Sequence, residues 1–571
     1  MTRLPTLPPT ILSKTTGKSG LRATSALATS FTVSLALATS LALTGCGPSE
    51  DAGKDASNAA TNAAKEVSSA APQTPAKTAA EAPAVFVFGD TTFNAENEEP
   101  DVNPRNGYAG WAALRYGVGE TLFRYDEHMR PQPWLAERFE NVDPLTWKIE
   151  LKENVRFSNG RAVDAAAVKA SLEALVKEHA RARGDLQIAS VEADGLTLTI
   201  RTEVPRPTLV NYLSDPYGAV VDVEAGVKDG IVVGTGPYRA VKVVTNDSIE
   251  LVRNENYWGD TRPGYDRVRV LTISDGDTLT MALQSGEIDA AYGLPYASHV
   301  LFKKGGFVST STATSRTFFL HMNYKSPIAS DPAVRRAVAM AVDKERFASV
   351  LLQGNGVPAT GPFPADFAFG GKAVTARTFD LKAAAEVLEN AGWRDANGDG
   401  VREKDGKPLV VRWLTYPSRQ ELPLLAEMVQ ADLKSIGVKV EVNSTADHNA
   451  LRRRSETWDV YASAMVTAPT GDPAYFFTTH ALSSSSENNG GYVNPELEGL
   501  AETLSQTFDP ARREALAVDM QNRILADDAF VFAAHLKMTM VAREGVEGLK
   551  AHPTDFYEIT PVVRPREKAK P

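Results

Sequence analysis

One charge-free apolar run, residues 23–43, ends just before the only cysteine of the chain, Cys46. Basic residues precede the run and small residues follow it, which is the layout of a secretory signal. A membrane helix with an incidental cysteine is the alternative, but the run is barely long enough to span a bilayer and is rich in Ser and Thr. No later segment has a similar run, so we expect the rest of the chain to fold as a soluble body. With a single cysteine, that body has no internal disulfide and no multi-cysteine zinc site.

The sequence around the cysteine predicts how the protein is attached. Leu43-Thr44-Gly45-Cys46 resembles a bacterial lipobox, which implies that the chain is cleaved and that Cys46 is lipidated. Residues 47–83 are mostly Ala, Ser, Thr, Lys, Glu and Pro, and Val67 is their only large aliphatic residue. Such a composition buries too little to offset its ordering entropy. We therefore predict a signal peptide over 1–46, a disordered tether over 47–83, and a folded body held at the membrane of the cell envelope by the lipid.

Length and charge limit the class of protein. A chain of 571 residues is too long for one hydrophobic core and predicts two or three domains. A hydrophobic content of 43% is ample for globular packing. The formal net charge of -10 argues against a nucleic-acid partner, because a general nucleic-acid binder needs a basic face.

The first half of the body mixes strand and helix signals. Val85–Gly89 is typical of a buried strand, and Ile231–Tyr238 of a strand interrupted by glycine. The alternating residues Trp147, Ile149 and Leu151 predict a strand that leads through a turn at Asn159-Gly160 to a helix capped by Asp164.

The second half reads more cleanly as α/β. Asp331 and Asp380 each precede a helical pattern, as N-caps do. A third helix over residues 422–436 stops at Gly437 and passes into an alternating strand over 438–442. Helix, glycine and strand in this order are a unit of a layered α/β lobe, so the chain predicts a larger mixed lobe and a smaller α/β lobe.

Catalytic signatures are largely missing from the sequence. It has neither a Gly-x-Ser-x-Gly elbow nor a His-Glu-x-x-His motif, and its eight histidines lack metal-ligand spacing. Gly234-Thr-Gly236 lacks the rest of a phosphate loop and predicts a turn. Asp395–Glu403 begins like a calcium loop, but Gly406 stands where the bidentate glutamate would be, which favours a turn of Asp, Asn and Gly. Binding between two lobes is therefore favoured over catalysis, and we predict no cofactor.

Six short motifs follow one another along the body in a fixed order. They are Phe157-Ser-Asn-Gly160 with Asp164, Gly234-Thr-Gly-Pro-Tyr238, Arg253-Asn-Glu-Asn256-Tyr257-Trp258-Gly259, Gly286-Glu-Ile-Asp289, Met322-Asn323 with Pro327, Asp331, Val334-Arg335 and Ala337, and Asn489-Gly-Gly-Tyr492-x-Asn-Pro-Glu496. Through these motifs, residues 84–560 resemble the family 5 extracellular solute-binding proteins, the peptide-, opine- and nickel-binding components of ABC importers.

The resemblance implies a fold and partners. The fold would be α/β, a two-lobed periplasmic-binding-protein fold of type II (large, cluster C-like), with mixed sheets and a cleft between lobes joined by crossing strands. Lobe I would cover 84–315, lobe II 316–534, and 535–571 would return to lobe I and end in a C-terminal tail. The protein would be a monomer that closes on a small polar solute in the periplasm or extracytoplasmic space and delivers it to an ABC permease and ATPase.

The kind of solute stays open between branches of the family. Several motifs also look like the nickel-binding branch, but its ligand-contacting arginine and tryptophans do not carry over. Arg181 and Val466 stand where that branch has tryptophans, and Pro216 stands near its key arginine. The Asn488–Tyr492 segment leans towards peptides or opines. A nickel or metal-chelate binder is the alternative; an envelope hydrolase, or a peptide chaperone or sensor on the same fold, is a further one, and a hydrolase would need a nucleophile–base pair across the cleft.

Aromatic and charged residues in the predicted loops are the candidate cleft residues. Arginine pairs well with a carboxylate, and aromatic rings cover apolar parts of a ligand. The same aromatic types are more often core residues, which is the alternative for each. The candidates are Tyr108, Trp111, Arg115, Arg181, Tyr217, His321, Asn489 and Tyr492.

Overall fold

The computed structural model describes residues 83–93, 101–106 and 110–567. The predicted signal peptide with Cys46, nearly all of the predicted tether, and the candidate Tyr108 lie outside these residues. The names lobe I (84–315 and 535–571) and lobe II (316–534) are kept below for the predicted divisions, whose boundaries remain a prediction.

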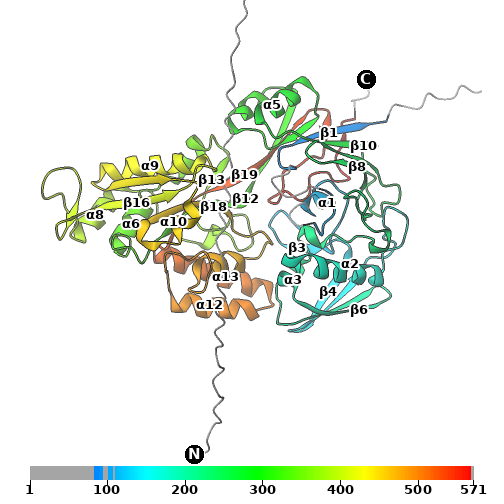
Figure 1. The fold of residues 1–571 in the computed structure, drawn as a ribbon, viewed down its shortest axis with the longest axis horizontal. Coiled ribbons are helices and arrows are strands. Elements are labelled where there is room, and N and C mark those ends of the chain that lie inside the picture. The colour runs from blue at the N-terminus through cyan, green and yellow to red at the C-terminus, as the bar shows by residue number, and fades with distance from the viewer. Residues whose placement is uncertain (1–82, 94–100, 107–109, 568–571) are drawn as a thin grey trace, which may run out of the picture. The chain divides into compact units, whose positions relative to one another are not determined.

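Eleven strands of the described chain form one mixed sheet that continues through both lobes. Its central strands are long and antiparallel, and Figure 1 shows them passing between the part of the sheet beside α9 and the part beside β1. In spatial order the strands are β17 (Lys439–Ser444), β16 (Val410–Thr415), β18 (Val460–Val466), β12 (Phe307–Met322), β19 (Phe530–Arg543), β11 (Ala290–Tyr292), β1 (Val85–Asp90), β10 (Arg267–Thr272), β9 (Ser248–Arg253) and β8 (Tyr238–Val244), with β13 (Gly356–Pro358) paired to β19.

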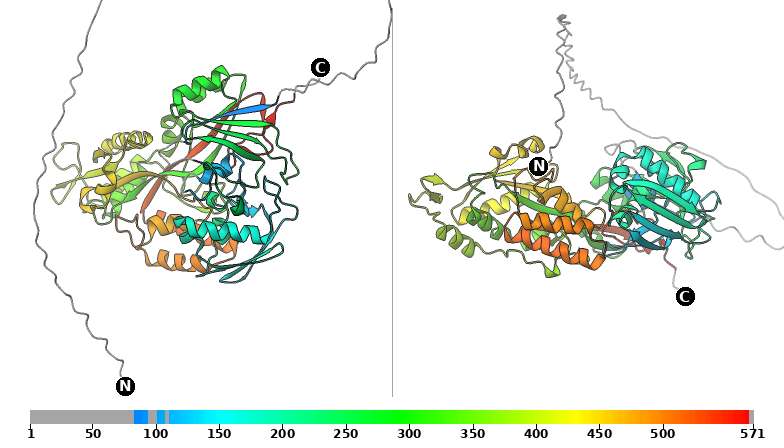
Figure 2. Two further views of the ribbon diagram at one scale, coloured as in Figure 1. Left: turned by 45° about the vertical axis from the view of Figure 1, so that its right-hand side comes forward. Right: turned by 90° about the horizontal axis from the view of Figure 1, so that it is seen from below.

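A second, four-stranded antiparallel sheet lies within lobe I, and α2 packs on it (Figure 2). Its strands in spatial order are β4 (Ala136–Asp143), β5 (Thr146–Leu151), β7 (Thr197–Thr202) and β6 (Ile188–Asp194). Three two-stranded ladders complete the pairing: β2 (Phe123–Tyr125) with β3 (Pro131–Pro133), β14 (Glu403–Lys404) with β15 (Lys407–Pro408), and β20 (Val546–Glu547) with β21 (Arg564–Pro565).

The helices cover the sheets, and polar N-cap residues explain where several of them begin. Asp164, Asp331 and Asp380 each accept a hydrogen bond from a backbone N–H in the first helical turn, which confirms the three predicted caps. The helices are α1 (Trp111–Arg115), α2 (Ala165–Glu178), α3 (Ala180–Leu186), α4 (Leu209–Tyr212), α5 (Gly276–Ser285), α6 (Pro332–Met340), α7 (Lys344–Arg346), α8 (Leu381–Asn390), α9 (Glu421–Ser435), α10 (His448–Arg452), α11 (Ala474–Phe476), α12 (Pro495–Gln506) and α13 (Pro510–Ala526).

Three of the predicted motifs meet in lobe I. The backbone N–H of Ser158 donates to Gly234 O at 2.9 Å, and the side-chain amide of Asn256 donates to Ser158 O at 3.0 Å. Asn254 donates in turn to Gly236 O at 2.8 Å. A Cβ at Gly236 would collide with the carbonyl of Gly117, so the glycine serves close backbone packing and not phosphate binding. The motifs thus form a structural frame.

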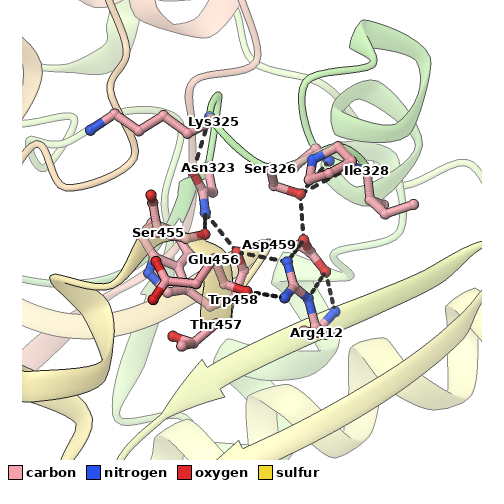
Figure 3. Close-up of polar contacts among 12 residues, drawn as sticks. Asn323, Lys325, Ser326, Ile328, Arg412, Ser455, Glu456, Thr457, Trp458 and Asp459 are labelled. Carbon is pink, nitrogen blue, oxygen red and sulfur yellow. Dashed lines mark hydrogen bonds and ion pairs between the residues drawn. The ribbon is translucent and has the colours of Figure 1, made fainter.

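One buried ion pair ties the end of β12 to the rest of lobe II (Figure 3). Asp459 is fully buried and accepts hydrogen bonds from Ser326 and from the guanidinium of Arg412, whose Nη2 lies 2.6 Å from Oδ1. Asn323 donates to the carbonyl oxygens of Ser455 and Trp458, both at 2.6 Å. These contacts fix where the crossing strand β12 leaves the sheet.

The structure contradicts part of one predicted strand, Ile231–Tyr238, and shows the predicted turn in the calcium-like loop. Ile231–Val233 is no regular strand; only isolated bridges occur there, and β8 begins at Tyr238, because Gly234 lies against the Val118 carbonyl and turns the chain. In the calcium-like loop, Asp395 accepts the backbone N–H groups of Gly398 and Gly400 at 2.8 and 3.0 Å. That is the geometry of a turn.

Candidate functional site

A bulge interrupts the pairing of the two crossing strands midway along their length. Ala313 pairs with Lys537 and Thr317 with His535, so three residues of β12 lie opposite Leu536 alone. Thr314 donates its hydroxyl to Leu536 O at 2.8 Å and accepts the backbone N–H of Arg316 at 3.2 Å. A bulge bends a strand locally and often re-aims a side chain. The bulge therefore marks the point where the strands shared by both lobes are least regular.

Arg316 in this bulge lies near a second arginine, Arg419, which precedes α9 in lobe II. Burial lowers the pKa of Arg316, and the positive charge of Arg419 lowers it further. Within the described part of the chain, neither guanidinium has a hydrogen-bonded or ion-paired acidic partner. Asp555 opposes this by raising the pKa of Arg316, but it forms no ion pair with either arginine. A partly buried pair of like charges without a bonded counter-ion is unfavourable by itself, so this pair is suited to receive an anion.

Aromatic side chains from both lobes surround the two arginines. Tyr292 at the end of β11 raises the pKa of Arg316, as does Tyr416 at the end of β16. Tyr296 begins the short helix η5 (Tyr296–Phe302) and donates its hydroxyl to Glu421 at 2.9 Å. Burial raises the pKa values of Tyr292 and Tyr296 well above their usual range, so both hydroxyls stay protonated at neutral pH. The region offers donors and ring surfaces beside the charge.

Nearby carboxylates are already bonded within the protein. Glu421 accepts the Tyr296 hydroxyl, and Asp555 pairs with Arg115. The Asp555 side chain is nevertheless 41% exposed, which leaves it open to a further cation. The arginine pair and Asp555 thus place positive and negative groups within one region that both lobes contribute to; we define Arg316, Arg419, Tyr292, Tyr296 and Asp555 as the hinge site.

The predicted candidates at the first loop belong to a buried network beside the hinge site. Arg115 is 1% exposed, lies 2.9 Å from Asp90, and also pairs with Asp555 and, at 3.6 Å, with Glu558. Trp111 covers its guanidinium at 3.7 Å from the ring centroid. The charge of Arg115 is therefore used inside lobe I, where it positions Asp555.

Arg181 and Tyr217 form a separate cluster in lobe I. Arg181 contacts Asp215 at 2.6 Å and Asp185 at 3.3 Å, and its guanidinium lies over the Tyr217 ring at 5.3 Å. The Tyr217 hydroxyl donates to Asp185 at 3.3 Å, and the residue is 3% exposed. The positive charge of Arg181 thus has two acidic partners within lobe I.

His321 and Tyr492 lie inside lobe II, and the ring of each contacts the ring of Phe530, at 5.3 and 6.4 Å between centroids. His321 shares a hydrogen bond of 3.2 Å with the Ser463 hydroxyl, and burial lowers its pKa well below the usual range. Tyr492 is 2% exposed and donates to Asp527 at 2.8 Å. Asn489 donates to Glu487 O at 3.2 Å, near the surface. A ligand role for all these candidates remains a prediction.

None of the five residues of the hinge site was predicted from the sequence. Two predicted candidates, Arg115 and Trp111, lie at its edge. Arg316 and Arg419 are more than one hundred residues apart, and each has ordinary neighbours in sequence. The available signal was local: a single arginine in a strand that is otherwise free of acidic and basic residues apart from His321, and another arginine between Pro417 and the start of a helix.

The described residues contain neither a membrane-spanning helix nor a cluster of metal-binding side chains. No helix among them has the length and apolar character needed to cross a membrane. Nor do three or more His, Cys, Asp or Glu side chains in this part of the chain gather in a way that would hold a metal ion.

The chain is similar to known solute-binding proteins of one family. The family pattern described as bacterial extracellular solute-binding proteins, family 5 Middle, matches residues 130–488, more than half of the chain. The nickel-binding protein NikA of Staphylococcus aureus is 27% identical over 456 residues, 78% of this chain and 89% of the relative. The glutathione-binding protein GsiB of Pectobacterium atrosepticum is 26% identical over 457 residues, 76% of this chain and 86% of the relative.

A solved structure agrees with the observed fold. The crystal structure of a nickel ABC transporter from Bacillus halodurans is 30% identical, with a TM-score of 0.77, and the match covers 84% of this chain and 99% of that one. The predicted two-lobed α/β fold is therefore confirmed. With its sheet shared by two lobes, its ordered motifs and these relatives, the chain belongs to family 5 of the bacterial extracellular solute-binding proteins.

Proposed function

We propose that the protein captures a small solute bearing a carboxylate, of the peptide or opine class, at the hinge site and delivers it to the permease of an ABC importer. The observation that carries the proposal is the arginine pair, Arg316 and Arg419, which among the described residues has no hydrogen-bonded or ion-paired carboxylate, although the charge of Asp555 acts on Arg316 from nearby. Guanidinium groups bind carboxylates through two parallel N–H···O bonds, and such bonds are strongest where water is excluded.

The surroundings favour a solute with both charge signs. Asp555 keeps an exposed carboxylate that suits an ammonium group, while the tyrosines supply ring surfaces for apolar parts. The relative named for glutathione supports this class, since glutathione is a peptide with two carboxylates and an ammonium group. A site with such groups would discriminate against uncharged sugars.

Lobe closure follows from the placement of these groups. Arg316 lies in the bulge, Arg419 in lobe II, and Tyr292 and Asp555 in lobe I. A solute that contacts all of them gains its full interaction energy only when the lobes are closed, and so shifts the population towards the closed form. We place the hinge at residues 313–317 and 535–537, in line with the predicted lobe boundaries.

A metal chelate is the second candidate. Two of the relatives above are named for nickel, the nickel-binding protein NikA and the nickel ABC transporter. Since no cluster of metal-binding side chains occurs in the described ranges, recognition would fall on the carboxylates of the chelating molecule, and the same arginines would provide it.

Calorimetry with a defined panel tests the proposal. Di- to pentapeptides, opines and nickel–histidine are titrated into the purified chain, and thermal unfolding is followed in parallel. We expect at least one carboxylate-bearing solute to bind 1:1, and Arg316→Gln to weaken it at least about tenfold, the equivalent of about 1.4 kcal/mol. Arg138→Gln is the matched control, since Arg138 is 73% exposed and its one ion pair among the described residues is with Glu150 on the surface. A panel without any stabilising solute would refute these ligand classes.

A lipid anchor completes the proposed arrangement. Cys46 follows the small residues Thr44 and Gly45, which fit cleavage and lipidation at the cysteine. The anchor would hold the binding body near the permease.

A further inference from the structure

The two lobes touch a second time, away from the hinge site. Asn211 of lobe I donates its side-chain amide to Thr470 O at 3.0 Å, and Arg130 pairs with Glu514 at 3.0 Å. Gly471 has a φ of +61°, and a Cβ there would collide with the carbonyl of Met129. This contact brings the loop before α11 directly onto lobe I.

A cavity of about 230 Å³ lies at this contact. One wall comes from lobe I, with Phe139, Trp147 and Val210, and the other from lobe II, with Phe369 and Phe508. The rings of Trp147 and Phe508 are 6.0 Å apart across the contact, and those of Phe139 and Trp147 are 6.2 Å apart. Three aromatic side chains from two lobes therefore meet at one cavity.

The charged groups at the cavity are already neutralised by one another. Arg513 pairs with the buried Asp472 at 2.5 Å, and Arg130 pairs with Glu514. Neither pair leaves a net charge for an ionic ligand. The other polar side chains of the wall, Gln132 and Asn211, donate hydrogen bonds to Asp126 and to Thr470 O. The rest of the wall is apolar and aromatic, which disfavours water as the occupant.

From these observations the geometry points to a second binding site, for a small uncharged aromatic molecule, in the cavity between Trp147 and Phe508. An apolar cavity of about 150 Å³ admits benzene in another protein, so a larger one admits a molecule the size of phenol or indole. Offset or edge-on packing of such a ring against the three wall rings adds to the gain from burial. The residues of the hinge site take no part in this cavity.

Occupancy would act on the equilibrium between open and closed forms. Since the walls belong to different lobes, the molecule is buried on both faces only when the lobes are in contact. It therefore binds the closed form more tightly and stabilises it, with or without a solute at the hinge site. This inference goes beyond the proposed function and does not depend on which solute is carried.

Titration of indole into the purified full chain tests the site. We expect saturable 1:1 binding, seen by calorimetry and as a rise in the unfolding temperature. Ala368→Phe, which fills the cavity from the lobe II wall, should weaken binding at least about tenfold. Val142→Phe is the matched control: it adds similar bulk on β4, at a 56% exposed position outside the cavity, and should leave indole binding unchanged.

A distance measurement separates this site from unspecific binding. In a Cys46→Ala chain, spin labels on Lys148→Cys and Arg512→Cys report the separation of the lobes, since both positions are exposed and lie outside the cavity. Indole should increase the short-distance population, and Ala368→Phe should cancel that increase. Absence of saturable binding, equal binding to Ala368→Phe, or an unchanged distance distribution would each overturn the inference.

Discussion

Trp258 donates its indole N–H to Glu120 Oε2 at 2.7 Å, inside lobe I. Glu120 is fully buried and also accepts the hydroxyls of Thr235 at 2.9 Å and Tyr257 at 3.2 Å. One carboxyl thus joins two motifs that are separate in sequence. Burial raises the pKa of Glu120 to about 7, while the three donors lower it. The residue is a structural acid poised to titrate in the neutral range.

Glu120→Gln should therefore change how stability depends on pH. The folded pKa is raised, so the folded chain binds more protons than the unfolded one between pH 4.5 and 7, and wild-type stability falls as the pH rises through this range. Glu120→Gln has no titrating carboxyl at this position, so its stability does not fall in this way as the pH rises. Its stability relative to wild type should increase by about 3 kcal/mol between pH 4 and pH 8, measured by urea unfolding. A constant difference across that range would contradict the assignment.

His480→Phe should stabilise lobe II. His480 is fully buried among Phe319 and Phe476, and neither ring nitrogen has a hydrogen-bond partner among the residues that the structure describes. Phenylalanine removes two unsatisfied polar atoms, so we expect a gain of about 1–2 kcal/mol at pH 7.

Acid should widen the advantage of His480→Phe. Burial lowers the pKa of His480 to about 3, so wild type loses stability as the pH falls below 6.5, and by pH 5 the variant should gain about 2 kcal/mol more. His535 is the control: its pKa is likewise lowered to about 3 by burial, but its Nδ1 shares a hydrogen bond of 2.9 Å with Thr317. His535→Phe should show the same pH trend yet destabilise the chain at pH 7.

Gly471→Val should hold the lobes apart, because its side chain would meet the Met129 carbonyl. We expect a larger radius of gyration in small-angle scattering and at least about tenfold weaker solute binding. Gly406→Val provides the control, since Gly406 has a similar φ of +72° and nothing within 4 Å of its Cβ position. If both variants scatter alike, backbone strain and not the lobe contact explains the effect.

Local chemistry made much of the fold predictable. Asp164, Asp331 and Asp380 cap helices as predicted, because a cap depends only on the next three residues. The buried strand at Val85 and the helix that ends before Gly437 follow from periodicity in the same way. Ile231–Val233 failed as a strand because the deciding contact, Gly234 against Val118, is distant in sequence.

The hinge site was much harder to predict, because its contacts also join residues that are distant in sequence. A ligand contact for Arg115 stays a prediction, and its partners Asp555 and Glu558 lie at the other end of the chain, so its pairing left no local signal. Arg316 and Arg419 form a pair of charges only in the folded chain, where the bulge in β12 places them together. The ordered family motifs identified the structural frame of lobe I. The arginines without a bonded carboxylate, Arg316 and Arg419, lie outside these motifs.

Cys46→Ala should abolish lipid labelling. Growth with a radioactive or clickable fatty acid should label the wild-type chain and leave the variant unlabelled, since the thiol is the only one in the sequence. Cys46→Ser serves as the conservative control and should also stay unlabelled. A labelled variant would contradict the anchor.

The central claim is that the hinge site binds a carboxylate through Arg316 and Arg419. Calorimetry with one binding peptide in two forms tests it most directly: the free C-terminal acid and the C-terminal amide. We predict that the amide binds wild type at least about thirtyfold more weakly, and that an Arg316→Gln and Arg419→Gln double variant binds both forms with equal, weak affinity. Equal binding of acid and amide to the wild-type chain, or a double variant that still prefers the acid, would contradict the claim.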